Sequence, residues 1–152
     1  MQIYRHIPKI NPHSACVLTI GNYDGIHLGH QKLINELLIK SKDMKIQSAI
    51  MIFEPHPKEF FTAKDAPSRL TSLREKIEFF IEKKIDRVYI MKFNKSFANM
   101  SGANFVLKLK KQLSVKTILV GEDFRYGINR DSGIKDLEKS GIEALIVKEI
   151  TI

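Results

Sequence analysis

The stretch that most constrains the fold is residues 16–31, where an apolar run meets a glycine-containing turn and then a helical pattern. Residues 16–20, CVLTI, show no clear alternation of polar and apolar side chains, which is typical of a strand covered on both faces. Turn formers that tolerate unusual backbone angles follow, namely Gly21, Asn22, Asp24 and Gly25. Apolar residues then recur at helical spacing, so the pattern predicts a strand, a turn and a helix that starts near Leu28.

Two histidines, His27 and His30, stand three residues apart at this predicted helix start, so both rings can point the same way. The first N–H groups of a helix have no partner within it, and its N-terminal end carries about half a positive charge, which favours anions. Gly29 lacks a Cβ atom and lets a ligand come close. We therefore expect a phosphate site here, made by Gly21, Asn22, Asp24, Gly25, His27, Gly29 and His30.

Two other interpretations of the histidine pair stay open. Imidazoles one helical turn apart can share a zinc ion, but such a site needs further ligands. The remaining candidates, none at a convincing spacing, are His6, His13, Cys16 and His56. We therefore predict no metal site built directly by the protein, while two surface histidines without a role remain the second alternative.

Strand and helix patterns alternate along the whole chain, which predicts right-handed βαβ units and a parallel sheet. The five expected strands are residues 16–20, 46–54, 87–93, 117–121 and 143–148, and residues 2–4 also fit a short strand. Helices are expected after Leu28, from an N-cap at Thr71 to about Lys84, from a cap at Ser101 to about Leu113, and over residues 136–139, with 94–100 as a connector. We predict an α/β fold, a Rossmann-like doubly wound parallel sheet of five strands, with ligands at the carboxyl ends of the strands.

Two of the segments that follow strands carry unusual residues. Pro55 and Pro57 flank His56, and because each proline disfavours helix in the residue before it, they indicate a stiff extended turn that presents His56 outward. Two prolines that simply end a strand would give the same pattern. After the fourth expected strand, residues 122–133 are polar, aromatic and glycine-bearing, EDFRYGINRDSG, as in many functional loops.

Four segments carry a resemblance to a known family. They are GNYDGIHLGHQ at residues 21–31, FEPHP at 53–57, LT at 70–71 and VGEDFRYG at 120–127. The first is similar to the signature of the nucleotidyltransferase superfamily that has a His-x-Gly-His element. Together they resemble the adenylyltransferase module of bacterial bifunctional riboflavin kinase/FAD synthetases, and their order and spacing cover nearly the whole chain.

This resemblance implies a fold of the nucleotidyltransferase type and a reaction. AMP would pass from ATP to FMN, giving FAD and pyrophosphate, with Mg²⁺ bound to the ATP phosphates. Catalytic roles would fall to His27, His30 and Asp123, and Asp123 could position Mg²⁺ or a ribose hydroxyl or merely cap a turn. FMN would lie between Pro55, His56 and Pro57 and the aromatic residues Phe124 and Tyr126, which could equally be packing residues. Arg125 and Arg130 are candidate phosphate ligands by charge alone, and we assign Arg130 to ATP.

The resemblance also predicts which parts of a family member this sequence contains. We expect one domain over residues 1–152, with the riboflavin kinase domain absent here and present in a full-length form. The resemblance implies an ISSTxxR element just past the last strand, and the sequence ends with residues 149–152, EITI, where that element would begin. We therefore expect a C-terminal truncation that places the activity in doubt. A weakened remnant that still binds flavin or adenine nucleotide, or a nucleotidyltransferase for another phosphorylated acceptor, are the alternatives.

The charge, the cysteine count and the apolar runs of the sequence limit the kinds of partner and compartment that we expect. The net charge is +8, but each half of the chain carries +4 and no basic tail or recognition motif is present, so we expect no nucleic-acid partner. One cysteine cannot form an internal disulfide, and no long apolar run follows a basic N-terminal segment. We therefore expect a cytoplasmic protein without a membrane partner.

Overall fold

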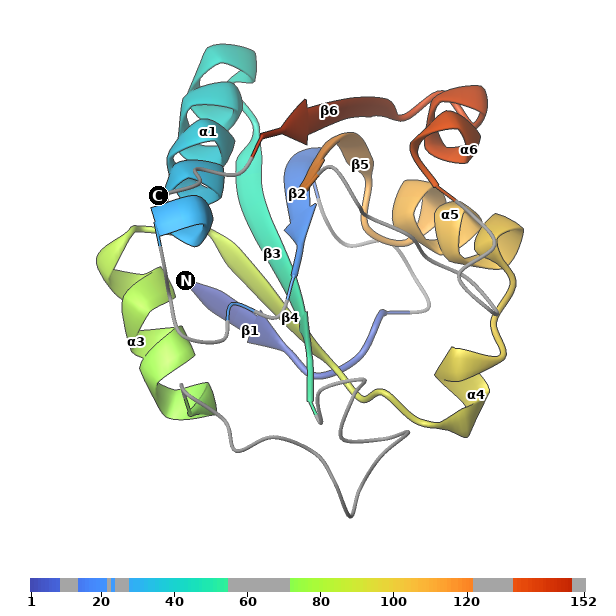
Figure 1. Cartoon of the computed structure of the whole chain (residues 1–152), viewed down its shortest axis with the longest axis horizontal. Helices are drawn as coiled ribbons and strands as arrows, with labels where there is room; N and C mark the ends of the chain where they lie inside the picture. The colour runs from blue at the N-terminus through green and yellow to red at the C-terminus, as the bar shows by residue number, and fades with distance from the viewer. Residues whose placement is uncertain (9–13, 22, 24–27, 55–71, 122–132, 149–152) are drawn as a thin grey trace.

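The computed structural model describes residues 1–8, 14–21, 23, 28–54, 72–121 and 133–148. Within these ranges the chain forms one parallel sheet of six strands in the order β1-β4-β3-β2-β5-β6 (Figure 1). The strands are β1 (Gln2–Tyr4), β2 (Cys16–Ile20), β3 (Gln47–Phe53), β4 (Arg87–Met91), β5 (Val115–Gly121) and β6 (Glu143–Val147). The prediction of a doubly wound parallel sheet is confirmed.

The predicted count of five strands is wrong by one, because residues 2–4 form the edge strand β1. Gln2 lies opposite Arg87 of β4, and the Tyr4 ring stacks on Tyr89 with 5.1 Å between ring centroids. The sequence allowed a short strand here but did not count it in the sheet, because the strand is short and mostly exposed and so lacks a buried apolar pattern. Backbone pairing with β4 stabilises the strand, although its own residues show no apolar pattern.

Helices cover both faces of the sheet. They are α1 (Leu28–Met44), α3 (Leu73–Glu82), α4 (Lys95–Ala98), α5 (Gly102–Lys111) and α6 (Ile134–Lys139). Figure 1 shows α1 and α3 on one side of the sheet and α4, α5 and α6 on the other. Among the described helices, none has the length and apolar character needed to cross a membrane.

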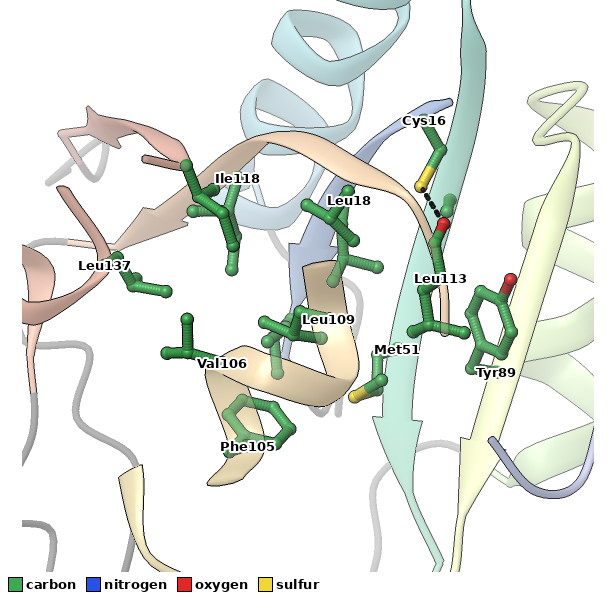
Figure 2. Close-up of a cluster of buried hydrophobic side chains, with 14 of the residues drawn as sticks. Cys16, Leu18, Met51, Tyr89, Phe105, Val106, Leu109, Leu113, Ile118 and Leu137 are labelled. Carbon is green, nitrogen blue, oxygen red and sulfur yellow. Dashed lines mark hydrogen bonds between the residues drawn. The ribbon is translucent and has the colours of Figure 1, made fainter. Parts of the chain in front are cut away.

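The alternate side chains of β2 explain why this strand shows no polar alternation. Cys16, Leu18 and Ile20 join the apolar cluster under α5 and α6, while Val17 joins the cluster under α1 and α3. Figure 2 shows the first cluster, where strand residues meet Phe105, Val106 and Leu109 of α5 and Leu137 of α6. A central strand with helices on both sides must be apolar throughout, as the sequence indicated.

Several predicted boundaries shift by a few residues. The N-cap of α3 is Ser72 and not Thr71, because the Ser72 hydroxyl accepts a hydrogen bond from the Glu75 N–H at 3.2 Å in a capping box. Ser101 caps α5 as predicted. The expected connector 94–100 contains the short helix α4, which is capped by Asn94. The predicted start of the strand at residue 117 is also corrected, because β5 begins at Val115.

A buried arginine joins the strands at the N-terminal edge of the sheet. Arg87, the first residue of β4, has no exposed surface. Its guanidinium donates hydrogen bonds to Gln47 Oε1 (2.6 Å), Tyr89 Oη (3.3 Å), the Leu113 carbonyl (3.4 Å), and the Ser14 carbonyl and hydroxyl. These acceptors lie at the start of β3, within β4 itself, and just before β2 and β5. Arg87 therefore links β4, β3, β2 and β5 by hydrogen bonds at the N-terminal ends of the strands. Ligands bind at the opposite, carboxyl ends in this type of fold.

Candidate functional site

The strand order reverses at β2, which has β3 on one side and β5 on the other. From β2 the chain passes through α1 to β3 and through α3 to β4, and it then returns to the far side of β2 as β5. In open α/β sheets ligands bind at this reversal, beyond the carboxyl ends of the strands. The three motif-bearing segments predicted from sequence continue from the ends of β2, β3 and β5, which are adjacent parallel strands. Their starting points therefore lie side by side at one edge.

The turn after β2 is held by close packing. The Gly21 N–H donates to the Met51 carbonyl at 3.1 Å, which extends the pairing of β2 with β3. A Cβ atom at Gly21 would lie 3.1 Å from the Tyr23 ring, closer than nearly all real Cβ contacts. A side chain at Gly21 would therefore require the Tyr23 ring to shift by a few tenths of an ångström.

Tyr23 anchors this turn in the core. Its side chain is only 1% exposed, its ring packs edge-on against Phe80 of α3 at 5.4 Å, and its hydroxyl donates to Thr19 Oγ1 at 3.2 Å. Burial raises the pKa of Tyr23 above its usual value, so the hydroxyl keeps its proton and acts as a donor. Its positive φ of 55° is uncommon outside glycine and indicates that the surroundings impose this backbone shape.

Sequence reasoning assigned no role to Tyr23, although it stands within the first motif. The available signal was one large aromatic ring among small turn formers. In this fold the ring is the part of the turn that faces the core, and it connects the motif to α3. Tyr23 therefore anchors the turn after β2 to the core and to α3.

Helix α1 begins at Leu28, as predicted, so Gly29 and His30 belong to its first turn. The first turn contains no acidic residue that would compete with a bound anion. Ile34 and Leu37 pack α1 against the sheet with no exposed surface. Since α1 follows β2, its N-terminal end lies at the carboxyl edge of the sheet, where the sequence placed the phosphate site.

An aromatic group that the sequence analysis did not single out lies at the ends of β3 and β4. Phe53, the last residue of β3, packs against Phe97 of α4 at 5.1 Å and against Phe93 at 5.8 Å. All three rings are partly exposed. Phe97 also contacts Phe105 of the core at 5.8 Å. These rings give the edge of the sheet an apolar, aromatic surface directly before the predicted flavin turn.

The other predicted site residues lie outside the described residues. They are Asn22, Asp24, Gly25, His27, Pro55, His56, Pro57, Asp123, Phe124, Arg125, Tyr126 and Arg130. The His30 side chain is likewise not described, although its backbone is. Their roles stay predictions. In the ranges that are described, no three His, Cys, Asp or Glu side chains lie close enough together to hold a metal ion.

Residues 9–152 match the FAD synthetase family. The chain belongs to this family. It is 40% identical over 146 residues to the bifunctional riboflavin kinase/FMN adenylyltransferase of Escherichia coli strain K12, covering 94% of this chain and 47% of that protein. The protein of the same name from Buchnera aphidicola subsp. Acyrthosiphon pisum is 41% identical over 143 residues, covering 93% and 46%. The chain therefore spans about half the length of these relatives.

A solved structure supports the fold independently. The crystal structure titled as a macrolide-efflux protein from Streptococcus pneumoniae superposes with a TM-score of 0.82 at 22% identity, covering 98% of this chain and 51% of that one. At this identity the likeness concerns the fold alone. The family match and this fold together confirm the resemblance drawn from the four sequence motifs.

Proposed function

We propose that this chain is an FMN adenylyltransferase that transfers AMP from ATP to FMN and releases FAD and pyrophosphate. The observation that carries the proposal is the FAD synthetase match, which extends over residues 9–152. The curated relatives are named for two activities, and this chain matches about half of their length. The family match supports the FAD-forming activity for the half that this chain matches, and we propose that the kinase activity belongs to the other half of those relatives.

The reaction needs no covalent enzyme intermediate. A phosphate oxygen of FMN attacks the α-phosphorus of ATP, and the bond from that phosphorus to the bridging oxygen breaks as pyrophosphate leaves with the electron pair. The protein has to align two anions that repel each other and to stabilise the charge at the reacting phosphorus. In this proposal the N–H groups at the start of α1, with His27 and His30, bind the ATP phosphates.

FMN would occupy the space next to β3. The turn that contains Pro55, His56 and Pro57 would form one wall, and Phe124 and Tyr126 would offer rings for stacking. The partly exposed rings of Phe53, Phe93 and Phe97 support this placement, because they give the end of β3 an aromatic surface. β3 is adjacent to β2, so this position lies next to the proposed ATP phosphates.

Mg²⁺ would be bound chiefly through the ATP phosphates, where it would neutralise part of their charge. In the sequence, two carboxylates come just after these strands: Glu54 directly follows Phe53 of β3, and Asp123, our candidate ligand, stands two residues after Gly121 of β5. Carboxylates of this kind usually supply one or two ligands to a nucleotide-bound Mg²⁺. We place the reaction in the cytoplasm, where ATP is supplied.

The test is FAD formation from FMN and Mg-ATP by the purified chain, followed by chromatography. Replacing His27 and His30 together by alanine should lower kcat/KM at least about 100-fold, because one donor to a developing charge is typically responsible for about 2.7 to 4 kcal/mol. His6→Ala is the matched control, since His6 is exposed beyond the edge strand β1 and should leave the rate unchanged. The absence of FAD above the enzyme-free background would refute the proposal.

A further inference from the structure

Two lysines of α1 hold the two ends of the edge strand β6. The Lys40 ammonium pairs with the Glu143 carboxylate at 3.3 Å, at the start of β6. The Lys32 ammonium donates to the Lys148 carbonyl at 3.2 Å, just past the end of β6. Lys32 and Lys40 are eight residues apart, which places them on one stripe of the helix. Of the two, Lys32 lies at the carboxyl edge of the sheet.

Lys32 differs from Lys40 in its charge environment. Lys40 faces a carboxylate, and so does Arg74, which pairs with Glu78 on α3. Within the described ranges, the Lys32 ammonium has a neutral carbonyl as its hydrogen-bond acceptor and no carboxylate within ion-pair distance. Among the described residues, Lys32 therefore lacks the close carboxylate partner that Lys40 and Arg74 have.

The position of Lys32 on α1 is also unfavourable for a lysine taken alone. It stands in the second turn, near the end at which the helix dipole is positive, and no acidic residue in the first turn offsets it. Natural sequences break such local preferences mainly at functional sites. A bound anion at this end would reverse the unfavourable interaction.

We propose that Lys32 is a further ATP-binding residue whose ammonium binds the polyphosphate of the nucleotide; this inference rests on the proposed function. Helical side chains lean toward the N-terminus of their helix, and four residues of helix span only about 6 Å, so Lys32 can reach the start of α1. The Lys148 carbonyl uses one of three ammonium protons and leaves two for phosphate oxygens. That hydrogen bond also orders the side chain before the nucleotide arrives.

Lys32→Met, which keeps the length of the side chain and removes its charge, tests the proposal, with Lys32→Arg as the conservative variant. Lys40→Met is the matched control, on the same helix and facing the same strand. Calorimetry with Mg-ATP should show affinity about tenfold weaker in Lys32→Met, within threefold of the parent protein in Lys32→Arg, and within twofold in Lys40→Met. The KM for ATP should rise in Lys32→Met while the KM for FMN changes less than twofold. The loss should shrink at high salt.

The outcomes separate this inference from the proposed function. If the parent protein binds Mg-ATP through Lys32 but forms no FAD, the inference stands and the proposed function fails. Unchanged Mg-ATP affinity in Lys32→Met overturns the inference whether or not FAD forms, as does a parent protein that does not bind Mg-ATP. An equal loss in Lys40→Met also overturns it, because the packing of β6, and not the charge at residue 32, would then explain both results.

Discussion

Replacing Arg87 by methionine should destabilise the protein strongly and leave the proposed activity intact. The guanidinium has no exposed surface and donates to groups of four residues, Ser14, Gln47, Tyr89 and Leu113. Each hydrogen bond contributes about 1 kcal/mol net, and acceptors left buried without a donor add to the loss. Relief from burying a charge offsets part of it. We expect the free energy of unfolding to fall by about 3 kcal/mol, which corresponds to a Tm lower by about 6 to 12 °C.

Urea unfolding followed by circular dichroism measures this change, with the slope of the transition as a check that the unfolded state is unaltered. Arg74→Met is the control, because the Arg74 side chain is 88% exposed and its pair with Glu78 lies on the surface of α3. That change should cost less than about 0.5 kcal/mol. At a temperature where both variants are folded, kcat/KM for FAD formation should stay within twofold of the parent protein.

Two results would refute this reasoning. A loss below about 1 kcal/mol in Arg87→Met would mean that water or neighbouring donors satisfy the abandoned acceptors, so that Arg87 does not join the strands energetically. A fall in activity in the folded Arg87→Met variant would mean that the two edges of the sheet are coupled. Arg87 would then influence the site, although it lies at the opposite ends of the strands.

Three further predictions concern a buried hydrogen bond, a buried thiol and a helix cap. Tyr23→Phe removes the donor to Thr19 and should lower the free energy of unfolding by about 1 kcal/mol in urea. Burial raises the pKa of the Cys16 thiol from 9.0 to about 11, so the unfolded chain releases this proton at a lower pH than the folded protein does. The free energy of unfolding should therefore fall by up to about 2 to 3 kcal/mol as the pH rises from 9 to 11. Urea unfolding at each pH should show a weaker dependence of this free energy on pH in a Cys16→Ala variant. Ser72→Ala breaks the capping box with Glu75 and should lower Tm by an amount equivalent to about 1 kcal/mol without altering FAD formation. A change smaller than the measurement error in any of the three would contradict the hydrogen bond, the burial or the helix cap on which that prediction rests.

The parts predicted correctly from the sequence are those that short-range patterns encode. The strand β2, the start of α1 at Leu28 and the cap at Ser101 each follow from a few neighbouring residues, through side-chain periodicity or a side chain that caps its own helix. The alternation of strands and helices then implied a parallel sheet with its motifs at one edge. The order of four motifs was enough to indicate the family.

The tertiary structure alone decided which side chains hold those elements together. Residues 2–4, for which the sequence allowed but did not require a strand, pair with β4, and Tyr23 becomes a core residue in a cluster that includes Phe80 of α3. In the sequence, Arg87 is a charge at the start of an apolar strand, and it is tolerated because acceptors from its own strand and from three other segments surround it. Lys32 comes next to β6 through a contact between residues far apart in the chain. Such partners are brought together by the packing of the whole sheet, so no local pattern in the sequence records them.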